Sequence, residues 1–144
     1  MTEFADLAAH LGSTDTVAII TTRPSGEEVA TPIWAVAVDG VPYVRSAYGE
    51  RAAWNRRARS GRPVAFTLTD GRRAERDARA ALGDPRLAVR VVHVEAGDPQ
   101  LDAVDVAFHA KYGRTPYVGT VVSDAARALT LRVEPSGAAL SREP

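Results

Sequence analysis

The sequence predicts a mainly β domain, a six-stranded antiparallel β-barrel with short helices at its ends. Six segments carry the alternating or β-branched pattern that is typical of strands. Several of these segments are joined by short turns, which antiparallel neighbours need. The chain has 144 residues, enough for one domain, and we assign 1–144 to a single domain with its core at about 15–135. A closed barrel removes the strand edges that an open sheet of this size would expose.

The N-terminal third predicts one helix and two strands. Residues 3–11 place their apolar side chains on one face, and Gly12 follows as a stop signal. Residues 16–22 are β-branched and predict the first strand. A Pro-Ser-Gly turn at 24–26 leads to a second strand over 28–38.

Asp39-Gly40, between two apolar runs, is the strongest hairpin signal in the chain. With these two residues as the loop, Val36 lies opposite Tyr43 and Trp34 lies opposite Arg45, so all four share one face. The other face carries Ile33, Ala35, Val44 and Ser46. A guanidinium opposite an indole predicts a cation–π pair between Arg45 and Trp34, worth about 0.5–2 kcal/mol.

The remaining elements follow the same signals. A helix is predicted over 50–60 with Gly61 as its stop, and a strand over 64–69. Residues 72–82 are polar and Ala-rich, and they favour neither a short exposed helix nor an irregular segment. A fifth strand covers 87–94 and a sixth covers 129–134. Between them, Asp98 caps a helix whose apolar stripe consists of Leu101, Val104, Phe108 and Tyr112 and ends at Gly113.

Composition excludes several classes of protein. Eighteen basic and eighteen acidic side chains cancel, which argues against a general affinity for nucleic acid or for an anionic membrane. No apolar run is long enough to span a bilayer, and residues 1–12 lack the basic start of a signal peptide. The absence of cysteine excludes disulfides, thiolate nucleophiles and Cys-ligated metals. We therefore expect a cytoplasmic protein.

The common catalytic signatures are missing from the sequence. It contains no serine-hydrolase elbow, no phosphate-binding Walker loop, no dinucleotide-binding glycine pattern and no HExxH zinc motif. The histidines at 10, 93 and 109 fall in different predicted elements without a carboxylate at ligand spacing. We expect no metal site, and no residue is assigned a catalytic role.

Pro32 lies inside the second predicted strand. Because proline has no N–H to donate, it is tolerated mainly at an edge strand or a bulge. Such a break leaves neighbouring main-chain groups able to bind a ligand instead of a strand. An ordinary edge proline that prevents pairing with another chain explains the residue equally well.

Arg45 and Ser46 end the third predicted strand, and the chain then passes through Gly49 to a helix start that carries Arg51. The free N–H groups of a helix start attract anions. A hydroxyl and two guanidiniums at the same junction predict a phosphate site.

Aromatic residues gather in the same region, because four of the nine in the chain fall between positions 34 and 54. They are Trp34, Tyr43, Tyr48 and Trp54. Flat ligands stack on flat side chains, so this region suits an aromatic ring with a phosphate tail. Alternatively, Trp54 simply anchors its helix on the barrel. We interpret the arginines at 56, 57, 59 and 62 as a solvated helix face rather than a nucleic-acid surface.

Several of these segments together resemble one known family. They are Thr31-Pro32-Ile33-Trp34, the hairpin to Tyr43-Val44-Arg45-Ser46, Gly49, Trp54, the stretch 108–113 (FHAKYG) and Thr130-Leu131-Arg132. Their order and spacing are similar to those of a small uncharacterised bacterial family within the pyridoxamine-5′-phosphate-oxidase-like split β-barrels, which bind FMN or a deazaflavin. The resemblance covers about 15–135. Residues 72–86 depart from it and are interpreted as an insertion.

This resemblance implies a split β-barrel homodimer that binds FMN or a deazaflavin in a groove between subunits. It implies that the backbone from Thr31 to Trp34 borders the isoalloxazine ring, and that Arg45, Ser46 and Arg51 hold the phosphate. The full set of implied cofactor-binding residues is Thr31, Pro32, Ile33, Trp34, Arg45, Ser46, Tyr48, Gly49, Arg51 and Trp54.

Three functions stay open at this point. The first is a flavin- or deazaflavin-dependent oxidoreductase acting on a small-molecule substrate, in which the cofactor performs hydride transfer and the protein orients it. The second is a non-catalytic dimeric barrel that binds a small ligand. The third is a nucleic-acid binder that uses the arginines of 51–62, and its binding would fall steeply with salt. The resemblance names no substrate and no electron acceptor.

Overall fold

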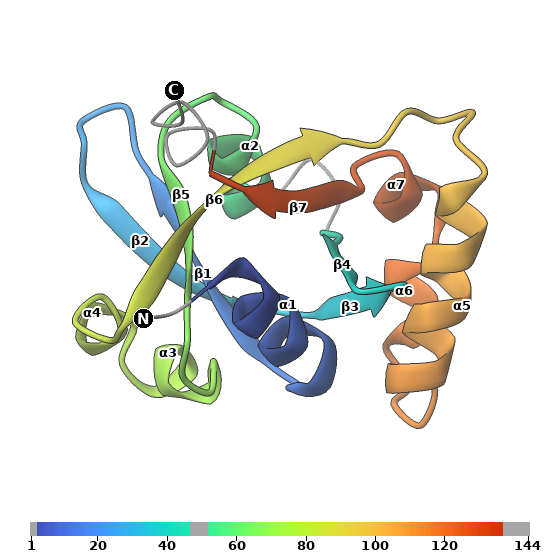
Figure 1. Ribbon diagram of the computed structural model, residues 1–144, viewed down its shortest axis with the longest axis horizontal. Coiled ribbons are helices and arrows are strands. Elements are labelled where there is room, and N and C mark those ends of the chain that lie inside the picture. Colours follow the sequence, from blue (N-terminus) through green and yellow to red (C-terminus); the bar gives the residue numbers. More distant parts are fainter. Residues whose placement is uncertain (1–2, 47–51, 137–144) are drawn as a thin grey trace.

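One antiparallel sheet of seven strands forms the framework in the computed structural model, which describes residues 3–46 and 52–136 (Figure 1). The strand order is β2-β1-β5-β6-β7-β4-β3, and every neighbouring pair is antiparallel. The strands are β1 (Val17–Thr22), β2 (Glu28–Ile33), β3 (Ala35–Val38), β4 (Val41–Val44), β5 (Val64–Thr67), β6 (Arg86–His93) and β7 (Leu131–Pro135). The sheet curls into a half-barrel with short helices around it, which confirms the predicted fold class.

The predicted strand count of six is wrong, because residues 28–38 form two strands rather than one. β2 and β3 are separated at Trp34, and they lie at opposite ends of the strand order. A single stretch of chain therefore runs from one edge of the curled sheet to the other. We call this junction, centred on Trp34, the β2–β3 corner.

The predicted hairpin between β3 and β4 is confirmed. Val38 pairs with Val41 and Val36 with Tyr43, the register expected from the turn. Asp39 has a φ of 51° and Gly40 a φ of 79°. Two successive residues in the left-handed region define the type I′ turn that matches the twist of a two-residue hairpin.

The two predicted faces of this hairpin enter two different parts of the core. Ala35 and Val44 pack inside the curled sheet, in a cluster with Leu7 and Leu11 of the first helix and Phe66 of β5. On the other face, Val36 and Tyr43 pack in a second cluster; its other buried members are Val94, Leu101, Val104, Phe108, Tyr112 and Val121. The hairpin thus joins the half-barrel to the C-terminal helices.

Seven helices occur in the described residues, and five of them lie where the sequence left room for a helix. They are α1 (Phe4–Ser13), α2 (Ala53–Ala58), α3 (Arg72–Arg76), α4 (Ala78–Ala81), α5 (Gln100–Tyr112), α6 (Val118–Val121) and α7 (Asp124–Arg127). α2 ends at Ala58, two residues before the predicted end, and Gly61 has a φ of 89° in the turn that follows. The Asp98 carboxylate accepts the Gln100 N–H at the start of α5. None of these helices is long and apolar enough to cross a bilayer.

Gly12 does not end the first helix, contrary to the prediction, because α1 continues to Ser13. A Cβ atom at Gly12 would lie 3.0 Å from the Cβ of Ala37. The glycine therefore lets α1 approach β3 closely and has no part in stopping the helix.

The last turn of α5 is fastened to the β2–β3 corner. Lys111 donates from Nζ to the carbonyl oxygens of Leu11 (3.0 Å) and Ala35 (2.6 Å). The Tyr112 hydroxyl donates to the Asp15 carbonyl oxygen (2.7 Å) and accepts the Ala35 N–H (3.3 Å). α1, β3 and α5 are thus joined around Ala35, one residue beyond Trp34.

Lys111 and Tyr112 make the stability of the protein depend on pH. Burial lowers the pKa of Lys111 to about 8 and raises the pKa of Tyr112 above its usual 10. Between pH 8 and 10 the unfolded chain still holds the Lys111 proton, which the native protein has released. We therefore expect the free energy of unfolding to rise as the pH increases through this range. Above pH 10 the native tyrosine keeps a proton that the unfolded chain loses, so stability should fall.

Urea unfolding at a series of pH values and constant ionic strength measures this profile. Lys111→Met should abolish the rise, and Tyr112→Phe should abolish the fall. Profiles for both variants that run parallel to that of the natural protein would show that neither group carries the effect.

Candidate functional site

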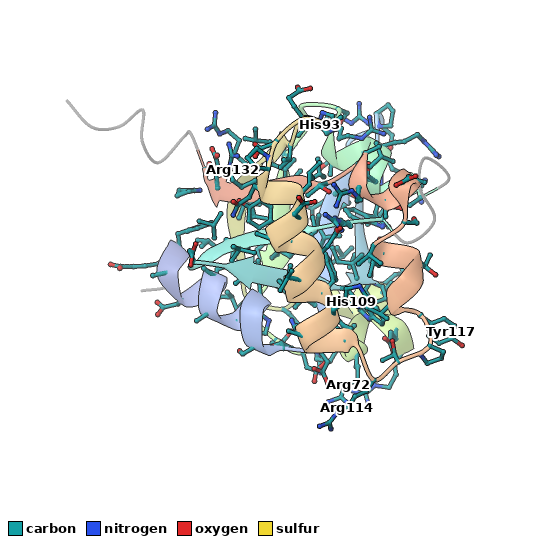
Figure 2. All side chains as sticks on the ribbon, turned by 90° about the vertical axis from the view of Figure 1, so that its right-hand side faces the viewer. Arg72, His93, His109, Arg114, Tyr117 and Arg132 are labelled. Atoms are coloured by element: carbon teal, nitrogen blue, oxygen red, sulfur yellow. The ribbon has the colours of Figure 1, made fainter. Side chains whose placement is uncertain are left out.

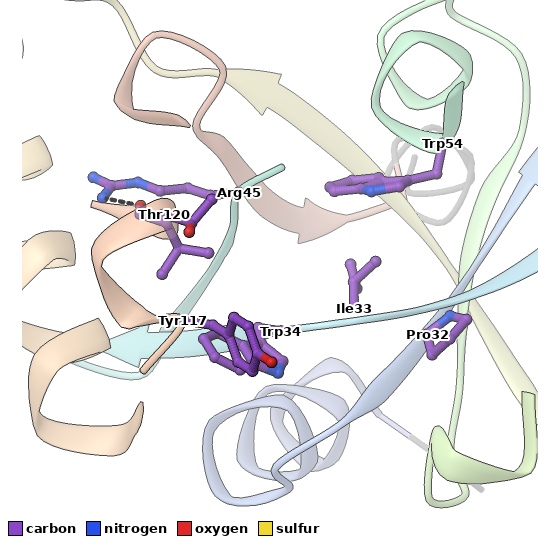
Figure 3. A pocket seen from close by; sticks show the side chains of 8 residues that line it. Pro32, Ile33, Trp34, Arg45, Trp54, Tyr117 and Thr120 are labelled. Carbon is purple, nitrogen blue, oxygen red and sulfur yellow. Dashed lines mark hydrogen bonds between the residues drawn. The ribbon is translucent and has the colours of Figure 1, made fainter. Parts of the chain in front are cut away.

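A pocket of about 510 Å³ opens at the β2–β3 corner (Figure 3). Its floor comes from the corner itself, and its walls come from α2 on one side and α6 on the other. The lining residues are Pro32, Ile33, Trp34, Arg45, Trp54, Tyr117, Thr120 and Val121. Five of the predicted cofactor-binding residues therefore line one cavity, although they come from three separate segments.

Pro32 lies in an edge strand, as its lack of an N–H requires. β2 pairs with β1 alone, with Pro32 opposite Ala18, and stands at the end of the sheet. Its outer edge is therefore not paired with any described strand. Pro32 and Ile33, at the end of this edge strand, both line the pocket.

The indole of Trp34 is held in place by α5. It stacks on the Tyr112 ring with centroids 4.1 Å apart and planes 3° from parallel. Tyr112 is itself fixed by its hydrogen bonds to Ala35 and Asp15. The half-buried indole is thus held in a fixed position in the pocket floor.

Trp54 both anchors its helix and lines the pocket. It is 7% exposed and packs in the inner core cluster, which also contains Ile33. In Figure 3 its ring and the Ile33 side chain point toward one another across the cavity. The structural role and the lining role that the sequence left as alternatives are therefore combined in one side chain.

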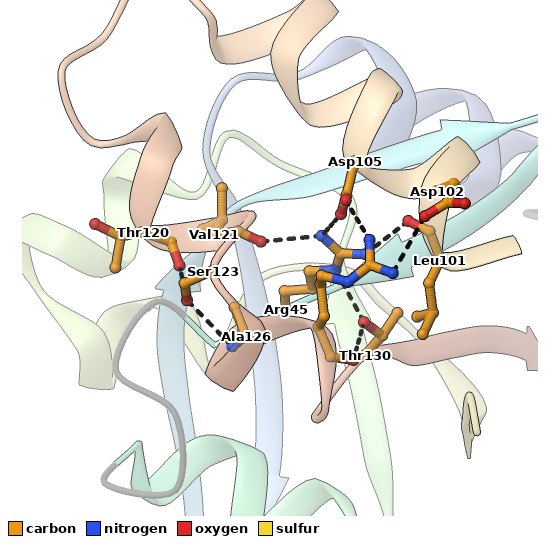
Figure 4. Close-up of polar contacts among 10 residues, drawn as sticks. Arg45, Leu101, Asp102, Asp105, Thr120, Val121, Ser123, Ala126 and Thr130 are labelled. Atoms are coloured by element: carbon orange, nitrogen blue, oxygen red, sulfur yellow. Dashed lines mark hydrogen bonds and ion pairs between the residues drawn. The ribbon is translucent and has the colours of Figure 1, made fainter. Parts of the chain in front are cut away.

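The guanidinium of Arg45 is completely buried in a polar network (Figure 4). Its Nε donates to Thr130 Oγ1 at 2.8 Å, one Nη donates to the Val121 carbonyl oxygen at 3.0 Å, and the other donates to the Leu101 carbonyl oxygen at 3.1 Å. An ion pair with Asp105, which also pairs with Arg127, compensates its charge. Burial lowers the pKa of Arg45, and the ion pair opposes this shift.

The predicted cation–π pair of Arg45 with Trp34 is wrong. Trp34 lies between β2 and β3 and stacks on Tyr112, whereas the Arg45 guanidinium lies 5.5 Å from the centre of the Phe108 ring. The strand ladder ends at Ala35 and Val44, so nothing keeps the next pair opposite one another. The phosphate role assigned to Arg45 stays a prediction, but its guanidinium is directed at protein acceptors.

The remaining predicted cofactor-binding residues do not line this pocket or lie outside the described residues. Thr31 is half-buried in β2 and does not line the pocket. Ser46 is fully buried just after β4. Tyr48, Gly49 and Arg51 lie outside the described residues, so their assigned roles stay predictions.

Three lining residues were missed, because the sequence analysis assigned no element to 114–128. Tyr117, Thr120 and Val121 come from α6 and the residue before it. Tyr117 is 68% exposed and projects from the surface in Figure 2. Ser123 was one available signal for a helix start, because its side chain caps α7 by accepting the Ala126 N–H. Helices of a single turn, however, are too short to show an apolar periodicity in the sequence.

The histidines do not converge on the pocket. His93 and His109 are labelled far apart in Figure 2, and His10 contacts the Thr69 carbonyl oxygen. Among the residues that the structure describes, no group of three potential metal ligands occurs.

Comparison with known proteins identifies a family and a fold. The profile of a family described as an uncharacterized protein conserved in bacteria, DUF2255, matches residues 7–133. No curated protein matches the sequence.

Solved structures with a similar fold share little sequence with this chain. HutZ, the heme storage protein from Vibrio cholerae, has a TM-score of 0.63 and 14% identity over 94% of this chain and 92% of its own. The conserved hypothetical protein Rv2991 from Mycobacterium tuberculosis has a TM-score of 0.59 and 19% sequence identity, and the match covers 94% of this chain and 81% of Rv2991. The FAD and heme binding protein from Mycobacterium smegmatis has a TM-score of 0.50 and 18% sequence identity, and the match covers 92% of this chain and 65% of that protein. At these identities the likeness shows the fold alone.

The buried position of Arg45 predicts a large effect on stability. Arg45→Met should lower the free energy of unfolding by about 3–5 kcal/mol, because the acceptors around it lose their donor and Asp105 loses one of its two partners. Arg72→Met, which removes an exposed pair with Asp70, is the control and should change stability little. Urea unfolding compares the two variants, and equal losses would mean that the Arg45 network is not a principal support of the fold.

Proposed function

The chain belongs to the bacterial family DUF2255, and we propose that it binds a flat aromatic cofactor of the flavin class in the pocket at the β2–β3 corner. The observation that carries the proposal is the convergence of Trp34, Trp54 and Tyr117 on one cavity, which residues of the edge strand β2 also line. The expected ligand is FMN or a deazaflavin, which share a planar three-ring system.

The residues present fit such a group. The cavity of about 510 Å³ lies within the usual range for ligand pockets, which is about 300–1,000 Å³. The aromatic side chains offer faces for stacking. The outer edge of β2 offers main-chain groups to the polar edge of a planar ring, and Pro32 adds no N–H that would attract a neighbouring strand.

An oxidoreductase of the pyridoxamine-5′-phosphate-oxidase-like superfamily is the activity that this site supports best. When bound, a flavin supplies the hydride transfer, so the protein needs no acid–base residue of its own. The chain would orient the ring between α2 and α6 and shield it from water with Trp54 and Val121.

Heme is the competing cofactor, because HutZ is a heme storage protein and the similar protein from Mycobacterium smegmatis binds FAD and heme. Heme iron needs an axial ligand such as histidine, cysteine, methionine or tyrosine. The described lining residues supply only the Tyr117 phenol. An aromatic lining with a single oxygen ligand favours the flavin class over heme.

Titration of the purified protein with FMN, with a deazaflavin coenzyme and with hemin tests the proposal. We expect FMN or the deazaflavin to bind, with quenched cofactor fluorescence. Tyr117→Ala should weaken binding about fivefold, because one stacked ring contributes about 1 kcal/mol. Tyr117→Phe keeps the ring and should bind like the natural protein.

Two results would contradict the flavin assignment. If hemin alone binds and its visible spectrum changes in Tyr117→Phe, the pocket is a heme site. If none of the three cofactors binds, the chain is a non-catalytic barrel for another small ligand.

We also expect a homodimer, as the family resemblance implies. Tyr117 and Val106 are exposed large apolar side chains on the C-terminal helical side, and a second copy would cover such surface. Light scattering at micromolar concentration should give twice the chain mass of 15.4 kDa. A monomeric mass for the folded protein would rule the dimer out under these conditions.

A further inference from the structure

A second cavity, of about 560 Å³, lies between the β1–β2 hairpin loop and α2, and arginines dominate its lining. The lining residues are Arg23, Pro24, Ser25, Ala53, Arg56, Arg57 and Arg62. Four arginines thus line one cavity, and none of these described lining residues is acidic. The cavity shares no lining residue with the pocket at the β2–β3 corner. We call it the arginine pocket.

The arginines reach this cavity from two elements far apart in the sequence. Arg23 comes from the hairpin loop, whereas Arg56 and Arg57 come from α2 and Arg62 follows it. Arg59, which the sequence analysis grouped with these arginines, instead donates from Nε to Asn55 Oδ1 at 2.7 Å. The grouping therefore depends on the fold, and the interpretation as a simple solvated helix face does not account for Arg23.

Hydrogen bonds to β1 orient two of the guanidiniums. Arg57 donates from Nε to Thr21 Oγ1 at 2.8 Å, and Arg62 donates from Nε to the Thr22 carbonyl oxygen at 2.8 Å. These bonds use the inner N–H of each guanidinium. A guanidinium fixed in this way presents its terminal nitrogens in the fork that suits phosphate oxygens.

In the part of the chain that the structure describes, neither Arg57 nor Arg62 forms an ion pair with an acidic side chain; their guanidiniums donate to Thr21 and Thr22. Glu27 pairs with Arg23 through its Nε at 2.8 Å. Burial and the neighbouring charges of Arg23, Arg56 and Arg62 lower the pKa of Arg57. Like charges gathered in this way destabilise a fold unless a counter-charge joins them.

We propose that the arginine pocket binds a multivalent phosphate, such as pyrophosphate or the oligophosphate end of a nucleotide. A monovalent anion would balance one guanidinium, whereas several guanidiniums at one cavity match a ligand with several negative charges. Phosphate oxygens also accept the paired N–H groups of arginine.

Isothermal titration with sodium pyrophosphate at fixed ionic strength tests this binding. The double variant Arg57→Gln/Arg62→Gln should bind at least about tenfold more weakly, since charge-assisted contacts are lost. The matched control is Arg76→Gln, because Arg76 is exposed on α3 and does not line the arginine pocket. Its affinity should equal that of the natural protein.

A second variant tests the same pocket without removing an arginine that supports the fold. Ala53 is exposed and lines the cavity, so Ala53→Glu places a carboxylate among the guanidiniums. We expect a higher melting temperature without ligand and a loss of pyrophosphate binding of at least about tenfold. Ala53→Gln adds a side chain of the same size without the charge, so it should change both the melting temperature and the pyrophosphate affinity less than Ala53→Glu does.

Several results would overturn the proposal. They are no pyrophosphate binding by the natural protein, equal affinity in the natural protein and Ala53→Glu, and equal losses in the double variant and Arg76→Gln. A single-stranded oligonucleotide that outcompetes pyrophosphate and depends on the same arginines would identify a nucleic-acid surface instead.

Discussion

The candidate pocket depends on one buried charge, the guanidinium of Arg45. A cation in the protein interior needs a counter-charge and a full set of acceptors, or it destabilises the fold severely. Here the acceptors come from α5, from the end of α6 and from the residue before β7. Arg45 itself follows β4, so its bonds join the sheet to all three segments. The wall formed by α6 is therefore fixed relative to the strand floor.

Helix α5 makes the second connection. Phe108 lies beneath the Arg45 guanidinium, and one turn later Tyr112 stacks on Trp34. Lys111 and Tyr112 bind both polar main-chain groups of Ala35. The stretch 108–113, which carried part of the sequence resemblance, thus includes the two side chains that hold the β2–β3 corner, Lys111 and Tyr112.

Local signals in the sequence predicted much of this molecule. The alternation of apolar and polar residues predicted the strands. The Asp39-Gly40 turn predicted the register of the hairpin and the two faces of its strands. Aromatic clustering indicated the pocket. The interruption at Trp34 could not be read locally, because it depends on Tyr112, far along the chain. The burial of Arg45 was missed for the same reason, since a strand-end arginine looks like a ligand until its distant acceptors are known.

The position of β7 has a consequence for the order in which the molecule is completed. This last strand lies between β6 and β4. A growing chain can therefore assemble β2-β1-β5-β6 and the β3–β4 hairpin as two separate pieces, but it cannot join them edge to edge before residue 131 has been made. The partners of Arg45 are synthesised late as well, at 101, 105, 121 and 130. Until then the arginine stays hydrated, so a nascent chain acquires its pocket only after residue 131 has been made.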